Sequence, residues 1–145
     1  EAWIAKGVEE GAELKIDGEQ MRFVTARWDG SEYGALHDDL VGSGHPSMHP
    51  DGRHVLTDCN AGFSVFCHED GTCPIRLCDI ETGEDRHIIR IYHVPKYYGP
   101  KHELRIDPHP AWDRQFRRIA FNASPDGTRR VNEADLSEIV SPMED

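Results

Sequence analysis

Hydrophobic and polar positions alternate over short stretches of this chain, and turn residues separate these stretches. The runs "HVLTD" (54–58) and "RIAFNAS" (118–124) are rich in β-branched and aromatic residues, as strands are. Pro50-Asp51-Gly52 precedes the first run, and Asp-Gly-Thr follows each run at 70–72 and 126–128. Asp-Gly pairs between such runs indicate tight hairpin turns. The pattern predicts an all-β fold of short antiparallel strands.

The chain repeats itself. "HPSMHPDGRHVLTDCN" (45–60) aligns without a gap on "HPAWDRQFRRIAFNAS" (109–124), at an offset of 64 residues. Downstream, the Asp-Gly-Thr motifs align at an offset of 56, so the first copy holds about eight extra residues between two strands. A fainter copy covers 16–40. Internal repeats of this length are typical of propellers and related arrays.

Each repeat predicts the strands of a propeller blade. In the middle copy, four strands follow the order strand, "PDG" turn, strand, "DGT" turn, strand, "TGE" turn and strand. We therefore expect β-propeller-like blades of antiparallel four-stranded sheets in a single unit over 1–145, with repeats at 12–42, 43–100 and 101–145. About three blades make a partial propeller, because closed propellers use about four to eight. Either the sequence is part of a longer chain, or several copies assemble into a ring, or the fold is a smaller antiparallel sandwich instead of a propeller.

The charge of the chain limits its partners. The formal net charge is −11, which argues against a general nucleic-acid binder. No apolar run has the length of a membrane span. Between residues 96 and 130, however, eight Lys and Arg stand against four Asp and Glu. This local excess indicates either an ordinary mixed surface or a site for an anionic ligand.

The four cysteines are Cys59, Cys67, Cys73 and Cys78, and no two of them form a CxxC pair. A zinc knuckle is therefore not expected. Buried or half-buried free thiols are the favoured interpretation. The alternative is a disulfide between Cys67 and Cys73 across the polar loop "HEDGT".

The recurring His-Pro step suggests a site. In a propeller, the first strand of each blade lines the central channel, so His45 and His109 are expected to converge although they are 64 residues apart. Before His109, the segment "KHELRIDPH" (101–109) alternates between ionisable and apolar positions, and Asp107 lies on the same face as His109. His45, His109 and Asp107 are thus candidate ligands of a divalent cation.

Candidate substrate-binding residues lie just upstream. Arg105 on the ionisable face has the planar fork that grips a carboxylate, and Lys101 adds a second positive charge. Tyr98, in "KYYG" (96–99), offers a ring for stacking on a sugar, although packing in the core or at the rim is an equal alternative. The structural alternative for the whole set is a repeat consensus in which histidine caps backbone groups and Asp107 pairs with Arg105. His49 is a weaker ligand candidate, because it lies in a turn.

Four stretches carry a resemblance to a known family: "GHPSMHPDGRHVLTD", "IRLCDIETGE", "RIDPHPAWD" and "RRIAFNASPDGTRRV". Over about residues 43–140 the chain resembles the oligogalacturonate lyases, a family of polysaccharide lyases, and more broadly the TolB/WD40-like propeller repeats. The resemblance implies a Mn²⁺ site at the channel mouth, with His45 and His109 at positions of its histidine ligands. Further histidines and a glutamine complete that pattern in the family, whereas this chain has Asp107 and Arg105 or Leu104 nearby.

The resemblance implies metal-assisted β-elimination on short uronic-acid oligosaccharides, with the catalytic base unidentified in this chain. The alternative function is a non-catalytic TolB/WD40-like module that binds sugar or protein, because fold alone does not settle function. The expected partners are an acidic oligosaccharide and whatever completes the propeller, either further copies or the rest of a longer chain. Neither nucleic acid nor membrane is expected, and the location stays open between cytoplasm and periplasm.

Overall fold

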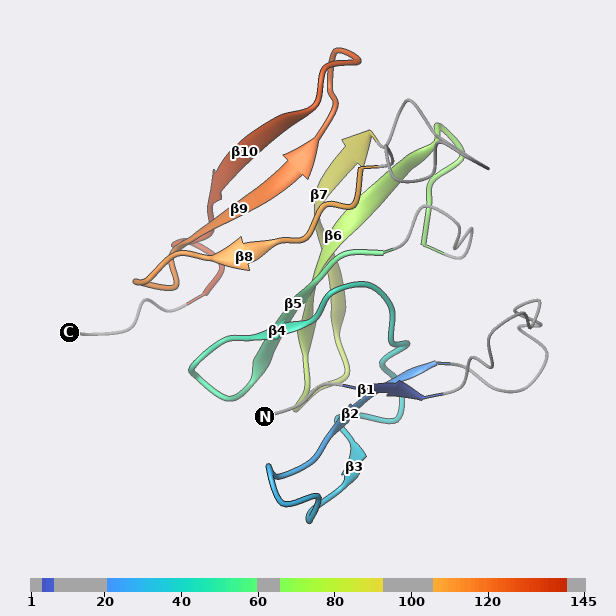
Figure 1. The fold of residues 1–145 in the computed structure, drawn as a ribbon, viewed down its shortest axis with the longest axis vertical. Coiled ribbons are helices and arrows are strands. Elements are labelled where there is room, and N and C mark those ends of the chain that lie inside the picture. The colour runs from blue at the N-terminus through green and yellow to red at the C-terminus, as the bar shows by residue number, and fades with distance from the viewer. Residues whose placement is uncertain (1–3, 7–20, 60–65, 93–105, 141–145) are drawn as a thin grey trace.

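The computed structural model describes residues 4–6, 21–59, 66–92 and 106–140. These residues form three antiparallel sheets that follow one another along the chain (Figure 1). The first sheet contains β1 (Ile4–Lys6), β2 (Arg22–Thr25) and β3 (Gly34–Ala35) in that order. The prediction of an all-β fold with antiparallel pairing is confirmed. The described residues contain no helix, and so none long and apolar enough to cross a membrane.

The second sheet has the four strands expected of a blade. Its order is β4 (Ser47–Met48), β5 (His54–Thr57), β6 (Thr72–Asp79) and β7 (Asp85–Tyr92). The turn predicted before β5 forms, since the His49 N–H donates to the carbonyl of His54. Strands that follow one another in the sequence therefore pair with one another, as the repeat predicts; short turns join β4 to β5 and β6 to β7, and the longer segment 58–71 joins β5 to β6.

The third sheet has the order β10, β9, β8, with β8 at Ala111–Trp112, β9 at Arg118–Ala123 and β10 at Arg130–Asp135. Within the described residues, this sheet and the first sheet each have three strands, whereas a complete propeller blade has four. The second sheet gains its fourth strand because the "TGE" turn is followed by the β-rich run of β7. No such run follows β10 within the described residues.

β5 and β6 of the middle sheet are covered on both faces, because the other two sheets lie on either side of them (Figure 1). All eight residues of β6 are buried. On one face, Leu56 and Ile75 pack with Ile119 and Phe121 of the third sheet. On the other face, Val55 and its neighbours pack against the first sheet; that cluster is Phe23, Leu40, Val55 and Cys78. Residues that alternate along β5 thus serve two different interfaces, as strand geometry requires.

Cys67 and Cys73 form a disulfide, with their Cα atoms 4.3 Å apart. The expectation of free thiols is wrong for this pair and right for Cys59 and Cys78, which are free and buried. The reason is the hairpin between the two cysteines. The His68 N–H donates to the carbonyl of Thr72 at 2.8 Å, and this turn places the flanking cysteines beside each other.

Candidate functional site

The two repeat-related histidines lie side by side. His45 precedes β4 and His109 precedes β8, and their ring centroids are 3.5 Å apart with an angle of 31° between the planes. The middle and third sheets therefore bring the same position of two repeats together. The convergence predicted from the repeat is observed for this pair, whereas a ligand role for either ring stays a prediction.

A buried carboxylate holds the histidine pair. Asp58 directly follows β5 and is 1% exposed. Its Oδ1 accepts the backbone N–H of His45 at 2.6 Å and lies 3.0 Å from Nδ1 of the His45 ring. Its Oδ2 accepts the backbone N–H of His109 at 3.0 Å. Asp58 thus accepts bonds from partly buried donors that precede β4 and β8, and such partners compensate a carboxylate for its burial.

Asp58 also sets the orientation of the His45 ring. An ionised carboxylate only accepts hydrogen bonds, so the contact at Nδ1 favours the tautomer in which Nδ1 carries the proton. Nε2 of His45 is then the nitrogen left for a ligand or for proton transfer. The His45 side chain is 38% exposed, so it remains accessible while its carboxylate partner is hidden from solvent.

The backbone adopts a positive φ at Gly44, just before His45, and at His109 itself. Gly44 has a φ of +77°, and a Cβ at this position would overlap the carbonyl and carboxylate of Asp58. His109 has a φ of +43°, in the left-handed region, although the following Pro110 disfavours helical conformations there. Such a conformation costs free energy and persists where the surroundings enforce it, which here includes the hydrogen bond to Asp58.

A cavity of about 290 Å³ opens beside His109. The described residues that line it are Ile106, Asp107, His109, Asn122 and Arg129. Arg129 contributes a guanidinium, Asp107 a carboxylate and His109 an imidazole. The cavity therefore offers both hydrogen-bond donors and an acceptor, with one apolar wall from Ile106.

Asn122 occupies in the third sheet the repeat position that Asp58 occupies in the second. Its backbone N–H donates to the carbonyl of Pro108 at 2.8 Å, and its side-chain amide donates to the carbonyl of Asp107 at 3.2 Å. Both residues thus fix the segment around a His-Pro step. The repeat alignment placed them opposite each other, and that was the sequence signal for their shared role.

The other predicted site residues have different outcomes. Tyr98, Lys101 and Arg105 lie outside the described residues. His49 is 1% exposed and packs edge-on against the ring of Trp112, with centroids 5.1 Å apart. It is therefore an interface residue between two sheets. Sequence reasoning did not identify Asp58 or Arg129 as site residues.

The three proposed metal ligands do not form one compact group of ligand atoms, although the rings of His45 and His109 are adjacent. The potential ligand atoms of His45, Asp107 and His109 do not all lie within 4.8 Å of one another. Among the described residues, Cys59, Cys67 and Cys73 do have their ligand atoms this close together. Nδ1 of His45 faces Asp58, so it is not available to an ion. A metal-ligand role for His45, Asp107 and His109 stays a prediction, in which Nε2 is the nitrogen that His45 could offer.

Comparison with known proteins supports the fold. The chain is similar to the crystal structure of TolB from Acinetobacter baumannii, with a TM-score of 0.55 and 19% sequence identity. The similarity covers 86% of this chain and 26% of that one. The chain has a TolB-like β-propeller fold. No family model matches this TolB-like chain, and no curated protein matches its sequence.

The TolB-like chain spans about a quarter of the length of the TolB structure that it matches. Together with the three antiparallel sheets, this length agrees with a partial propeller. At this level of identity the likeness concerns the fold, and a function has to be argued from the site itself.

Proposed function

We propose that this TolB-like segment binds a short acidic oligosaccharide at the His45–His109 pair and does not cleave it. The main support for the proposal is the close pair of imidazole rings of His45 and His109. Buried Asp58 contacts the His45 ring, and the cavity that Arg129 lines lies beside His109. The supporting carboxylate is hidden from solvent and occupied by three donors. It therefore does not compete with an anionic ligand for the exposed edge of His45.

The mixture of groups in the cavity suits an acidic sugar. A uronic acid presents one carboxylate and several hydroxyl groups on the same ring. The guanidinium of Arg129 matches the carboxylate through a two-bond fork, and imidazole N–H groups add donors. Asp107 accepts hydrogen bonds, which sugar hydroxyls can donate.

Tyr98, Lys101 and Arg105 remain proposed contacts for the rest of the oligosaccharide. They precede the cavity-lining residue Ile106 in the chain, and the two cations would offset the net charge of −11 toward a polyanion. The family resemblance also implies a bound Mn²⁺ ion. We propose this ion separately, and titrations with and without Mn²⁺ test it.

Closure of the propeller is part of the proposal. Closed propellers use about four to eight blades, and the described residues form three sheets. We propose that further blades, either from copies of this chain or from a longer chain, complete the ring around the site. The binding function then belongs to the assembled particle.

We expect trigalacturonate to bind the wild-type protein in isothermal titration calorimetry, and the neutral trisaccharide galactotriose to bind far more weakly. Arg129→Ala is expected to weaken binding roughly tenfold to hundredfold, because a charge-assisted hydrogen bond is worth about 1.5–3 kcal/mol. His45→Ala and His109→Ala should each weaken it by at least about tenfold. Titrations with and without Mn²⁺ show whether an ion contributes.

His87→Ala is the matched control, since His87 is exposed on β7 and takes no part in the pair. Equal affinity for the neutral and acidic sugars, or equal affinity of wild type and His45→Ala, would contradict the proposal. If neither sugar binds while an acidic protein partner does, the module recognises protein instead.

A second candidate function is the β-elimination that the resemblance implies, and the contact between His45 and Asp58 favours it. A histidine whose Nδ1 is held by a carboxylate has the arrangement of a general base, with Nε2 free to accept a proton. In that reaction Nε2 removes the C5 proton of a uronate. The electron pair then forms the C4–C5 double bond as the C4–oxygen bond breaks, and the leaving oxygen takes up a proton.

The ultraviolet absorbance of the C4–C5 double bond separates the two functions. With trigalacturonate, the binding module gives no rise in absorbance. A lyase gives a steady rise, and His45→Ala is then expected to lower the rate at least about a hundredfold, in line with the loss of a general base. A rise that His45→Ala leaves unchanged would exclude His45 as the base.

A further inference from the structure

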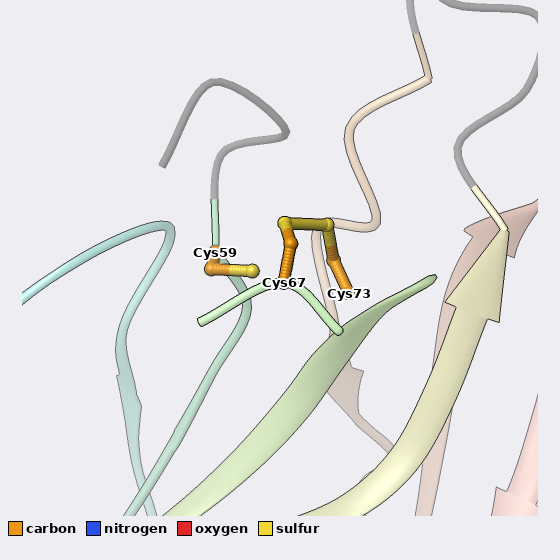
Figure 2. A group of neighbouring side chains, drawn as sticks. All are labelled: Cys59, Cys67 and Cys73. Atoms are coloured by element: carbon orange, nitrogen blue, oxygen red, sulfur yellow. A yellow bond between two sulfur atoms is a disulfide. The ribbon is translucent and has the colours of Figure 1, made fainter. Parts of the chain in front are cut away.

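Three cysteines meet outside the histidine site. Cys59 comes just after β5, Cys67 lies before the hairpin at 68–71, and Cys73 lies in β6. Their sulfur atoms all lie within 4.8 Å of one another. Figure 2 shows the Cys59 side chain directed toward the Cys67–Cys73 disulfide.

The cluster is enclosed by apolar and cationic groups. Cys59 and Cys73 are fully buried and pack with Phe66, whose ring lies 4.0 Å from the Arg76 guanidinium carbon. Burial raises the pKa of the Cys59 thiol to about 12; the charge of Asp58 raises it further and that of Arg76 lowers it. The thiol is therefore protonated at neutral pH, where it attacks the adjacent disulfide slowly.

We propose that Cys59, Cys67 and Cys73 form a three-thiolate site for a soft monovalent metal ion, Cu(I), once the disulfide is reduced. A dithiol supplies two electrons and two protons, which convert the Cys67–Cys73 bond into two thiols while the dithiol itself becomes a disulfide. Cu(I) then replaces the thiol protons and binds the three sulfur atoms. In the oxidised form two of the three ligands are tied up in the S–S bond.

The ligand set favours Cu(I) over Zn²⁺. Structural zinc sites are almost always four-coordinate, and thiolate sulfur is the ligand type that selects Cu(I). Among the described residues, the compact group of potential ligands consists of the sulfur atoms of Cys59, Cys67 and Cys73, with no fourth donor. The intervening segment 60–65 reads "NAGFSV" and contains no His, Cys, Asp or Glu. A buried trio of sulfurs therefore suits an ion that accepts three ligands.

The test is a Cu(I) titration of the full chain without oxygen, against a chromophoric Cu(I) chelator. After reduction with a phosphine and its removal, the wild-type protein is expected to withdraw one equivalent of Cu(I) from the chelator. The disulfide form should withdraw none at this site. Cys59→Ser should weaken binding by more than about a hundredfold, because even the loss of a residue behind a ligand costs about 10–100-fold.

Cys78→Ser is the matched control, since Cys78 is also a buried free thiol but lies in the cluster with Phe23 and Leu40. It should bind Cu(I) as the wild type does. X-ray absorption of the copper-loaded wild type guards against a misfolded variant, and a first shell of three sulfur atoms is expected. The proposal fails if the reduced protein leaves Cu(I) with the chelator, if the shell contains nitrogen, or if Cys78→Ser and Cys59→Ser lose affinity equally.

Discussion

Asp58→Ala is expected to lower the free energy of unfolding by about 3–5 kcal/mol, as measured by urea denaturation. The substitution leaves the partly buried backbone N–H groups of His45 and His109 without their acceptor, and an unsatisfied buried donor costs about 1–3 kcal/mol. The bond to the His45 ring is lost as well. The left-handed backbone of His109 also loses a contact that holds it.

The same substitution is expected to separate the two rings, because Asp58 is the group that both histidine segments share. Nuclear Overhauser effects between the rings of His45 and His109 should weaken or vanish. Asp51→Ala is the matched control: Asp51 also accepts bonds from two backbone N–H groups and a histidine ring, but its side chain is 29% exposed. Water can replace it, so the cost should stay near 1 kcal/mol. Equal costs for the two variants would contradict a special role for Asp58.

The convergence of His45 and His109 was predictable from sequence because it follows from symmetry. Residues at one position of a repeat occupy one position of each blade, and the ungapped match at an offset of 64 identified that position. No contact had to be known in advance. The antiparallel pairing of β4 with β5 and of β6 with β7 was also predictable, since a short turn between two such runs leaves little choice of partner.

The burial of Asp58 and its contacts were not predictable from its own segment, because an aspartate after a strand is a common turn residue. Nothing in "HVLTD" shows that its last residue is 1% exposed and accepts bonds from two sheets. The Cys67–Cys73 disulfide stayed open for a related reason. Its formation depends on the hairpin closed by His68 and Thr72, and the spacing of six residues fits either state.

The burial of Arg76 could not be predicted from the alternation of apolar and polar residues along its strand. In β6, "TCPIRLCD", a charged residue among apolar ones is expected to mark a solvent-facing side. Arg76 is instead fully buried, since sheets cover both faces of this strand. A two-sided burial of this kind removes the polar face on which period-two reasoning relies.

Asp85→Ala is expected to lower the free energy of unfolding by about 3–5 kcal/mol, because it leaves the buried guanidinium of Arg76 without its counter-charge. Nη2 of Arg76 lies 2.6 Å from Asp85 Oδ2, and Nε lies 3.0 Å from both carboxylate oxygens. After the substitution, the bond to the Val41 carbonyl and the contact with the Phe66 ring remain. Neither of these partners carries a negative charge.

The double variant Arg76→Met/Asp85→Ala should recover most of the loss, since it removes the buried charge together with its partner, and replacing a buried ion pair by apolar groups is often neutral. Urea denaturation of both single variants and the double variant gives the coupling energy of the pair. Glu133→Ala is the control: its pair with Arg118 is exposed on both sides, and such pairs contribute about 0–1 kcal/mol. If Asp85→Ala costs no more than Glu133→Ala, or if the double variant is as unstable as Asp85→Ala, then Arg76 does not depend on Asp85 for its place in the core.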